Sequence, residues 1–391
     1  MKEIYVVESL RTPLGSFGGA LSDVEAPQLA ATAITGVLER SGLDAEAVDE
    51  VIIGHVLSGG CGQAPARQAL LYAGLPETIP AMTVNKVCGS GLKAIMLGGG
   101  SIRLGDAEVV IAGGMENMSQ APYLLKKARY GHRMGNGEVT DLLIHDGLFD
   151  PYSGNHMGLL ADNTVEKQGV TRKEQDEFAV RSYQRAQAAI KDNIFDDEIV
   201  SVVKKTRKGE VTISEDEEPA RVDFDRLPTL RTAFKKDGTV TAGNASTIND
   251  GAAMTLLASG DAVQKYGLKP KARMVAYASN SIHPDDFTLA PVGAIEKVLA
   301  KANLTAGEID LYEINEAFAA VTLFAMKKFD LNPEKVNVNG GAVAIGHPLG
   351  ASGARITTTL VRELNRRQCR YGLATLCIGG GESVAAIFER V

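Results

Sequence analysis

Two cysteines stand beside glycines, where a thiol could act as a nucleophile or a base. Cys88 lies in the stretch 84–93 (VNKVCGSGLK), which we interpret as a strand end, a tight turn and the first turn of a buried helix. The glycines after Cys88 let the backbone bend and keep side chains away from the sulfur. The helix N-terminus would favour a thiolate over a thiol. Cys88 is therefore a candidate nucleophile, although a small buried core cysteine explains the residue equally well.

Three further residues fall at predicted strand ends. Cys377 follows the apolar strand 373–376, Asn315 follows the strand 310–314, and the glycine loop 340–348 presents His347 before a helix. Separately they could be a core cysteine, a turn residue and an exposed loop histidine. Two cysteines and a histidine, each beside glycines, together favour a nucleophile served by a general base.

The elements that must position these residues alternate between strand and helix, which is typical of a layered α/β fold. We expect strands at 48–56, 82–85 and 109–112, the last ending at Gly113-Gly114. Helices are expected from Pro27, at 67–74 and directly after Cys88. Because internal glycines are unfavourable in a helix, Gly98, Gly99 and Gly100 predict that the last of these helices is central and buried.

The segment 119–243 differs in composition. It has a basic cluster at 126–133, a capping box at Thr171-x-x-Glu174 that starts a helix, and an acidic run at 214–218 that we expect to be an exposed hairpin tip. We interpret this segment as a loop-rich insertion, which is where substrate contacts usually come from.

The last third of the chain repeats the pattern of the first. Val-Asn at 84–85 and Gly-Ser-Gly at 89–91 are echoed by Val-Asn at 338–339 and Ala-Ser-Gly at 351–353. Two related halves would bring equivalent strand ends together, at the sheet edge where chemistry sits in such folds. The expected domains are 1–118 with 244–268, the insertion 119–243, and 269–391.

Composition limits the partners and the compartment. The chain has 391 residues and a formal net charge of −7, which argues against nucleic acid as the main partner. Its four cysteines form no Cys-x-x-Cys pair and no His spacing completes a zinc site, so we expect free thiols in a reducing compartment. We find neither a leader nor a long apolar segment, and we expect a soluble cytoplasmic protein without a membrane partner.

Five motifs, in this order, resemble the thiolase family over essentially the whole chain. They are NKVCGSG at 85–91, NAS at 244–246 with NDGAA at 249–253, NEAF at 315–318, GHPLG at 346–350 and CIGGG at 377–381. The fold that this resemblance implies is α/β, with a duplicated, five-layered α-β-α-β-α core and an inserted loop domain.

The resemblance implies an enzyme of the acetyl-CoA acetyltransferase type. It would reversibly condense two acetyl-CoA into acetoacetyl-CoA and CoA through an acyl-cysteine intermediate on Cys88. His347 would accept the Cys88 proton, and Cys377 would remove the α-proton of the second acyl-CoA. One oxyanion would be stabilised by His347 and a water held by Asn315, the other by the N–H groups of Cys88 and Gly379. No metal or redox cofactor is implied, and relatives suggest a homotetramer with a role in fatty acid metabolism.

The resemblance also implies a set of contacts to coenzyme A or its acyl group. These residues are Leu148, His156, Met157, Arg221, Phe234, Ala242, Ala245, Ser246, Phe287, Ala317 and Phe318, with Arg221 at the nucleotide end.

The chain departs from the family pattern at two places. Phe287 stands near the acyl pocket where a methionine is usual, and Glu382-Ser383 replaces Met-Gly. The acyl chain length and the physiological direction stay open.

Three alternatives are kept. They are a thiolase for longer 3-ketoacyl-CoA, a carrier-protein ketoacyl synthase (which would lack the second catalytic cysteine), and a non-catalytic acyl-CoA or lipid-binding protein.

Overall fold

The computed structural model describes residues 2–207 and 209–391, and its core consists of two similar halves. The strands of the first half are β1 (Ile4–Arg11), β3 (Glu50–Gly54), β4 (Ala81–Val84), β5 (Val109–Asn117) and β12 (Asn249–Ser259). Those of the second half are β13 (Ala272–Ser281), β14 (Leu311–Ile314), β15 (Tyr371–Ile378) and β16 (Glu382–Arg390). The short strand β2 (Gly15–Ser16) pairs with β12.

The strand order confirms the duplication that the sequence predicted. In the described residues, the strands join in the order β14-β15-β16-β13-β1-β12-β5-β3-β4. Read outward from the centre, β1-β12-β5-β3 in the first half matches β13-β16-β15-β14 in the second. The halves meet where β1 pairs briefly with β13, at Tyr5↔Arg273 and Val6↔Ala272.

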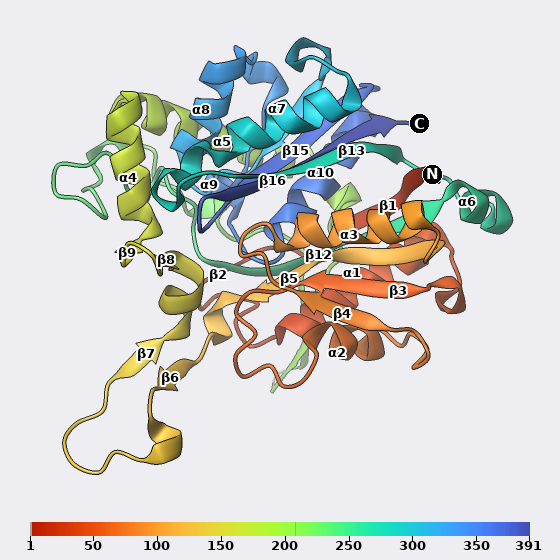
Figure 1. The fold of residues 1–391 in the computed structure, drawn as a ribbon, viewed down its shortest axis with the longest axis horizontal. Coiled ribbons are helices and arrows are strands. Elements are labelled where there is room, and N and C mark those ends of the chain that lie inside the picture. Colours follow the sequence, from red (N-terminus) through yellow and green to blue (C-terminus); the bar gives the residue numbers. More distant parts are fainter. Residues whose placement is uncertain (1, 208) are drawn as a thin grey trace.

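Helices cover both half-sheets and also fill the space between them (Figure 1). The central helices are α3 (Ser90–Leu104) and α10 (Ser352–Arg366), which contact each other. The outer helices are α1 (Ala26–Ser41) and α2 (Pro65–Tyr72) on the first half, and α7 (Ala290–Ala302) and α8 (Ala319–Phe329) on the second. Apolar side chains of α3 and α10 are buried in one cluster with strands of both halves. This is the expected five-layered α-β-α-β-α core, with α3 central and buried.

The two central helices touch backbone to backbone near their first turns. A Cβ on Gly353 would lie 2.3 Å from the backbone nitrogen of Leu92, and one on Gly91 would lie 2.8 Å from that of Ala354. Only glycine allows this separation. Because Cys88 precedes α3 and His347 precedes α10, the same contact brings the two candidate residues toward each other.

Strand β5 is longer than predicted, and the prediction that it ends at Gly113-Gly114 was wrong. It continues to Asn117, paired with β12 along its length. The glycines serve close approach rather than a turn, since a Cβ on Gly114 would lie 1.9 Å from the carbonyl oxygen of Gly350.

The segment between the halves is rich in short elements. They are β6 (Tyr123–Leu125), β7 (Val139–Asp141), β8 (Phe149–Asp150), β9 (Asn155–His156), α4 (Met157–Gln168), α5 (Arg172–Lys191), β10 (Val202–Thr206) and β11 (Gly209–Ile213). Two further short helices are α6 (Gly260–Tyr266) and α9 (Ala342–Ile345). The capping box predicted at Thr171 and Glu174 is confirmed at the start of α5. Strands β6 and β7 form an arm that projects from the body of the molecule (Figure 1).

The acidic run 214–218 is not the exposed hairpin tip that we expected. Asp216 is buried, and its carboxylate accepts two hydrogen bonds from the guanidinium of Arg11, at 2.7 and 2.9 Å. Arg11 is itself fully buried at the end of β1 and also pairs with Glu198. A charge run is usually solvated, but here a buried cation requires acidic partners.

Candidate active site

Cys88 stands in a turn that local hydrogen bonds hold in place. The turn leaves β4 after Val84, and the side-chain oxygen of Asn85 accepts the N–H of Val87 at 2.9 Å. Val87 has a φ of 45°. The Ser90 hydroxyl accepts the N–H of Lys86 at 2.8 Å and donates to the carbonyl of Val87 at 2.6 Å. The sulfur is therefore fixed at the start of α3, as the sequence predicted.

The second half of the molecule closes over this turn. Gly89 has ordinary helical angles, so it is not needed for a bend. A Cβ there would instead meet the Ile378 side chain at 2.3 Å, because the end of β15 packs against the turn. The N–H of Gly379 donates to the Cys88 sulfur, which partly offsets the rise in the pKa of the thiol that burial causes. Cys377 is 1% exposed at the same strand end, and it lines the same cavity as Cys88.

Both thiols are protonated in the resting protein. Burial raises the pKa of Cys88 to about 11, and it also raises the pKa of Cys377 well above the usual value. The helix N-terminus does not by itself yield a Cys88 thiolate in this state. A helix terminus contributes about 2 kcal/mol or less, and here the desolvation of a thiolate outweighs it.

His347 lies in the loop between α9 and α10, and a hydrogen bond to Ser352 fixes the orientation of its ring. Its Nδ1 lies 2.6 Å from the hydroxyl of Ser352, and that hydroxyl lies 2.8 Å from the carbonyl oxygen of Pro348. A carbonyl can only accept, so the Ser352 hydroxyl donates to Pro348 and accepts Nδ1–H from the imidazole. Nε2 is then unprotonated, and it has no hydrogen-bond partner among the described residues. Burial, with the charge of Arg355 added, lowers the pKa of His347 to about 3, so the ring is a neutral base.

Asn315 follows β14 and lies behind the imidazole. It is fully buried, and its Nδ2 lies 3.3 Å from Nδ1 of His347. Its oxygen faces Arg355 at 3.4 Å. The four predicted catalytic side chains therefore come from both halves of the fold and meet at one place, together with the N–H of Gly379.

Cys88, His347, Cys377 and Gly379 open into a cavity of about 250 Å³, whereas Asn315 is not among the residues that line it. Most of the predicted contacts line it. Cys88, His347, Cys377 and Gly379 are at its base, and its walls include Leu148, His156, Met157, Phe234, Ala245, Ser246, Phe287, Ala317 and Phe318. The wall is strongly aromatic, since His156 stacks on Phe234 with ring centroids 4.7 Å apart, and Phe318 meets the edges of Phe234 and Phe287.

Other residues of the wall were not predicted from the sequence. They are Met118, Gly147, Thr247, Ile248 and Leu349. Leu349 could have been found, because it lies two residues after His347 in the GHPLG motif. Ser352 was missed as the partner of His347, although it belongs to the Ala-Ser-Gly repeat.

Two predicted contacts do not line this cavity. Arg221 is exposed, and with Ala242 it lines a second hollow of about 250 Å³, which also includes Tyr183 and Arg226. The segment 242–247 connects the two spaces, since Gly243 lines the second hollow while Ala245 and Ser246 line the first.

Two general features of the described residues bear on ligands and location. They contain no group of three or more His, Cys, Asp or Glu residues that could hold a metal ion. None of their helices is both long enough and apolar enough to cross a membrane.

Comparisons with known proteins agree with this geometry over the full length of the chain. The sequence matches the thiolase N-terminal domain at residues 4–261 and the thiolase C-terminal domain at 268–390. It is 50% identical to an acetyl-CoA acetyltransferase of Pseudomonas aeruginosa, with 100% of both chains covered. It is 49% identical to a probable acetyl-CoA acyltransferase of Staphylococcus aureus, again over 100% of both chains.

A solved structure gives the same result for the fold. The crystal structure of the Bacillus anthracis acetyl-CoA acetyltransferase superimposes with a TM-score of 0.98 at 44% identity, covering 100% of this chain and 99% of that one. With two sulfurs, an imidazole and a carboxamide gathered between duplicated halves, the chain belongs to the thiolase family.

Proposed function

We propose that this protein is an acyltransferase that reversibly condenses two acetyl-CoA into acetoacetyl-CoA and CoA. The observation that carries the proposal is the single cavity that joins Cys88, His347 and Cys377. The relatives named as acetyl-CoA acetyltransferases, matched over their full length, support the same substrate. A thiolase acting on longer chains and a non-catalytic binding protein are less well supported, because the Pseudomonas aeruginosa and Chromobacterium violaceum relatives are named as acetyltransferases and the Staphylococcus aureus relative as a probable acyltransferase.

In the first half-reaction, we propose that Cys88 attacks the thioester carbonyl of acetyl-CoA. Nε2 of His347 takes the thiol proton as the sulfur–carbon bond forms. The N–H groups of Cys88 and Gly379 stabilise the oxyanion, each donor being worth ~3–4 kcal/mol in such sites. The carbon–sulfur bond to CoA then breaks, the proton passes from His347 to the CoA sulfur, and acetyl-Cys88 remains.

In the second half-reaction, Cys377 acts as the base toward a second acetyl-CoA. Its own pKa is raised by burial and by the nearby Cys88. Acylated Cys88 cannot ionise, so its contribution to the raised pKa of Cys377 is absent at this stage. Cys377 passes its proton to Nε2 of His347, and the resulting thiolate takes the α-proton. The carbanion attacks the acetyl-Cys88 carbonyl, the carbon–sulfur bond to Cys88 breaks with release of acetoacetyl-CoA, and His347 returns a proton to the Cys88 sulfur. The enolate oxygen is stabilised by His347 and by a water held by Asn315.

We place the coenzyme A chain along the segment 242–247, between the two hollows. The apolar wall of the active cavity suits the pantetheine arm, whereas Arg221 and Arg226 of the second hollow suit phosphate groups. None of these steps changes an oxidation state, so we propose no metal or redox cofactor.

We also propose a homotetramer, a dimer of dimers. The outer edge of β4 is the end of the sheet in the described residues. Met82 of β4 is exposed, and so are Leu71 and Tyr72 of α2, the helix that contacts β4. The β6–β7 arm exposes further apolar side chains, including Tyr130 and Met134. Light scattering should give the mass of four chains, and a dimer mass would contradict this.

The cellular setting is likewise a proposal. The four cysteines are free thiols in the structure, which suits a reducing cytoplasm. Acetyl-CoA and acetoacetyl-CoA carry acyl groups of two and four carbons respectively, so we assign the enzyme to fatty acid metabolism. The inserted segment 119–243 would supply the coenzyme A contacts and, through its arm, the contacts between dimers.

The test is CoA-dependent cleavage of acetoacetyl-CoA, followed by loss of enolate absorbance. Cys88→Ser should lower the rate at least ~10³-fold, and Cys377→Ser should block condensation while mass spectrometry still detects acetylated Cys88. Cys369→Ser, outside the cavity, is the matched control. No turnover with any ketoacyl-CoA from C4 to C10 would favour a binding protein, and normal condensation by the Cys377 variant would remove its assigned role.

A further inference from the structure

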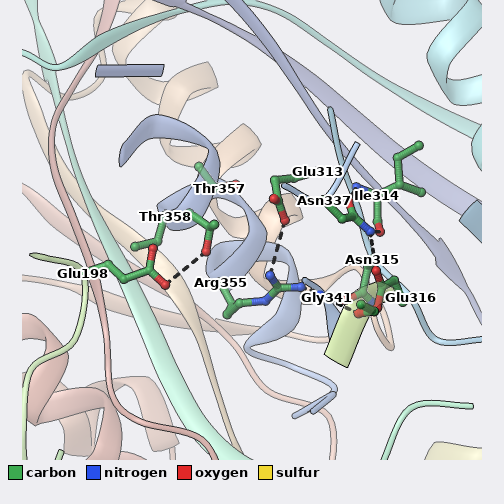
Figure 2. Close-up of polar contacts among 12 residues, drawn as sticks. Glu198, Glu313, Ile314, Asn315, Glu316, Asn337, Gly341, Arg355, Thr357 and Thr358 are labelled. Atoms are coloured by element: carbon green, nitrogen blue, oxygen red, sulfur yellow. Dashed lines mark hydrogen bonds and ion pairs between the residues drawn. The ribbon is translucent and has the colours of Figure 1, made fainter. Parts of the chain in front are cut away.

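A buried cation lies directly behind the candidate catalytic residues. Arg355, on the first turns of α10, is 1% exposed, and its Nη1 lies 3.4 Å from the carboxylate of Glu313, which is 2% exposed. Its Nη2 lies 3.4 Å from the side-chain oxygen of Asn315, so the guanidinium faces both residues (Figure 2). A buried charge lowers the stability of a fold unless it is well paired, and this one lies next to the candidate catalytic residues.

The contact decides which way the Asn315 amide points. A guanidinium has only donors, so it can face only the oxygen of the carboxamide. The NH₂ group must then point to the other side, where it lies 3.3 Å from Nδ1 of His347. Because Nδ1–H donates to Ser352, the NH₂ group makes no hydrogen bond to it, and Nδ1–H alone would favour the amide oxygen on this side. Arg355 therefore holds the amide in an orientation from which it could otherwise rotate by 180°.

Regular secondary structure places these groups together. Glu313 and Asn315 are two residues apart at the end of β14, so both face the same side of the strand. Ser352 and Arg355 are three residues apart on α10, so they share one face of the helix. One turn of α10 therefore holds the imidazole through Ser352 and the carboxamide through Arg355.

We propose that Arg355, paired with Glu313, is a positioning residue that orients the Asn315 amide and sets the electrostatics of His347 for the condensation. This inference rests on the proposed acyltransferase function. In addition to burial, the charge of Arg355 lowers the pKa of His347, which keeps the ring neutral. Nothing in the five sequence motifs pointed to this arginine.

The test compares Arg355→Gln/Glu313→Gln with a matched control on the same helix. Burial raises the pKa of Glu313 to about 8, and the double variant removes the Arg355 charge together with the carboxyl group that faces it, so neither is left buried without the other. Arg362 and Glu8 form another buried ion pair, two turns further along α10 and without contact to Asn315 or His347. Arg362 also pairs with Asp197 and Glu8 with Lys271, so Arg362→Gln/Glu8→Gln measures the effect of losing at least as much ion pairing away from the candidate active site.

Two readouts are taken on the full-length enzyme. In acetoacetyl-CoA cleavage, Arg355→Gln/Glu313→Gln should lower kcat ~30–100-fold with KM within about threefold, and Arg355→Lys should recover part of the loss. In NMR of the enzyme with ¹³C-labelled histidine, assigned with His347→Gln, the titration of His347 should move up by at least about half a pH unit.

The outcomes separate this inference from the proposed function. If the control pair loses as much kcat, or if the His347 titration does not move, Arg355 is only structural and the inference falls. If the wild-type enzyme cleaves no ketoacyl-CoA, the proposed function fails, and the NMR experiment still tests whether Arg355 acts on His347. If the double variant does not fold, Arg355→Lys, which keeps the charge but loses the fork, is compared with wild type by both readouts.

Discussion

The neutral state of His347 should make the stability of the protein depend on pH in a defined way. The ring has a pKa of about 3 when folded, against 6.5 for an ordinary histidine. Between these values the unfolded chain binds a proton that the folded chain does not. Lowering the pH through this window therefore favours unfolding. Each pH unit below 6.5 removes about 1.4 kcal/mol, so His347 alone should destabilise the fold by about 2 kcal/mol at pH 5.

The perturbation that isolates this effect is His347→Gln, which cannot titrate. Urea denaturation at pH 7, 6 and 5, at fixed protein concentration because assembly shifts apparent stability, gives the free energy of unfolding of each protein. Other buried groups titrate equally in both, so they cancel in the difference. The wild type should lose about 2 kcal/mol more than the variant between pH 7 and pH 5. Two curves that stay parallel over this range would show that His347 is not held neutral by burial.

Three further predictions follow from other buried contacts. Burial opposes a charge on His55, but Cys61 and Glu116, whose carboxylate lies 3.3 Å from Nε2, outweigh burial and raise the pKa of His55 to about 9. The stability that the charged ring contributes is present below pH 6.5 and is lost as the pH rises toward 9. Wild type should therefore lose about 3 kcal/mol more than His55→Gln over that window. Gly114→Ala, whose Cβ would lie 1.9 Å from the Gly350 carbonyl oxygen, should cost ~3 kcal/mol in urea denaturation. Ser352→Ala should lower kcat about tenfold at unchanged KM, because it frees the His347 tautomer.

Each of these has a result that would contradict it. Equal stability losses of wild type and His55→Gln between pH 6.5 and 9 would mean that His55 is not charged in the fold. A wild-type urea midpoint for Gly114→Ala would mean that β5 and the loop after His347 are not in close contact. A wild-type kcat for Ser352→Ala would mean that another group sets the tautomer.

Local patterns in the sequence predicted the parts of the fold that depend on near neighbours. The capping box at Thr171 involves residues three apart, and the turn at Cys88 is closed by Asn85 and Ser90 within a few positions. The repeated Val-Asn and small-Ser-Gly units predicted the duplication, because equivalent sequences fold into equivalent strands and helices. The motifs also identified most of the cavity wall.

Only the tertiary structure decided the properties that depend on burial and on distant partners. The helix terminus beside Cys88 suggested a thiolate, but burial under the other half of the molecule keeps the thiol protonated. The acidic run 214–218 looked solvated, yet Asp216 is the partner of the buried Arg11, 205 positions away in sequence. No sequence pattern near Arg355 indicated its role, because that role depends on Glu313 and Asn315, which lie at the end of β14 and not on the helix that carries Arg355. Short-range sterics and hydrogen bonding can be read along a chain, whereas desolvation and charge pairing depend on which segments pack together.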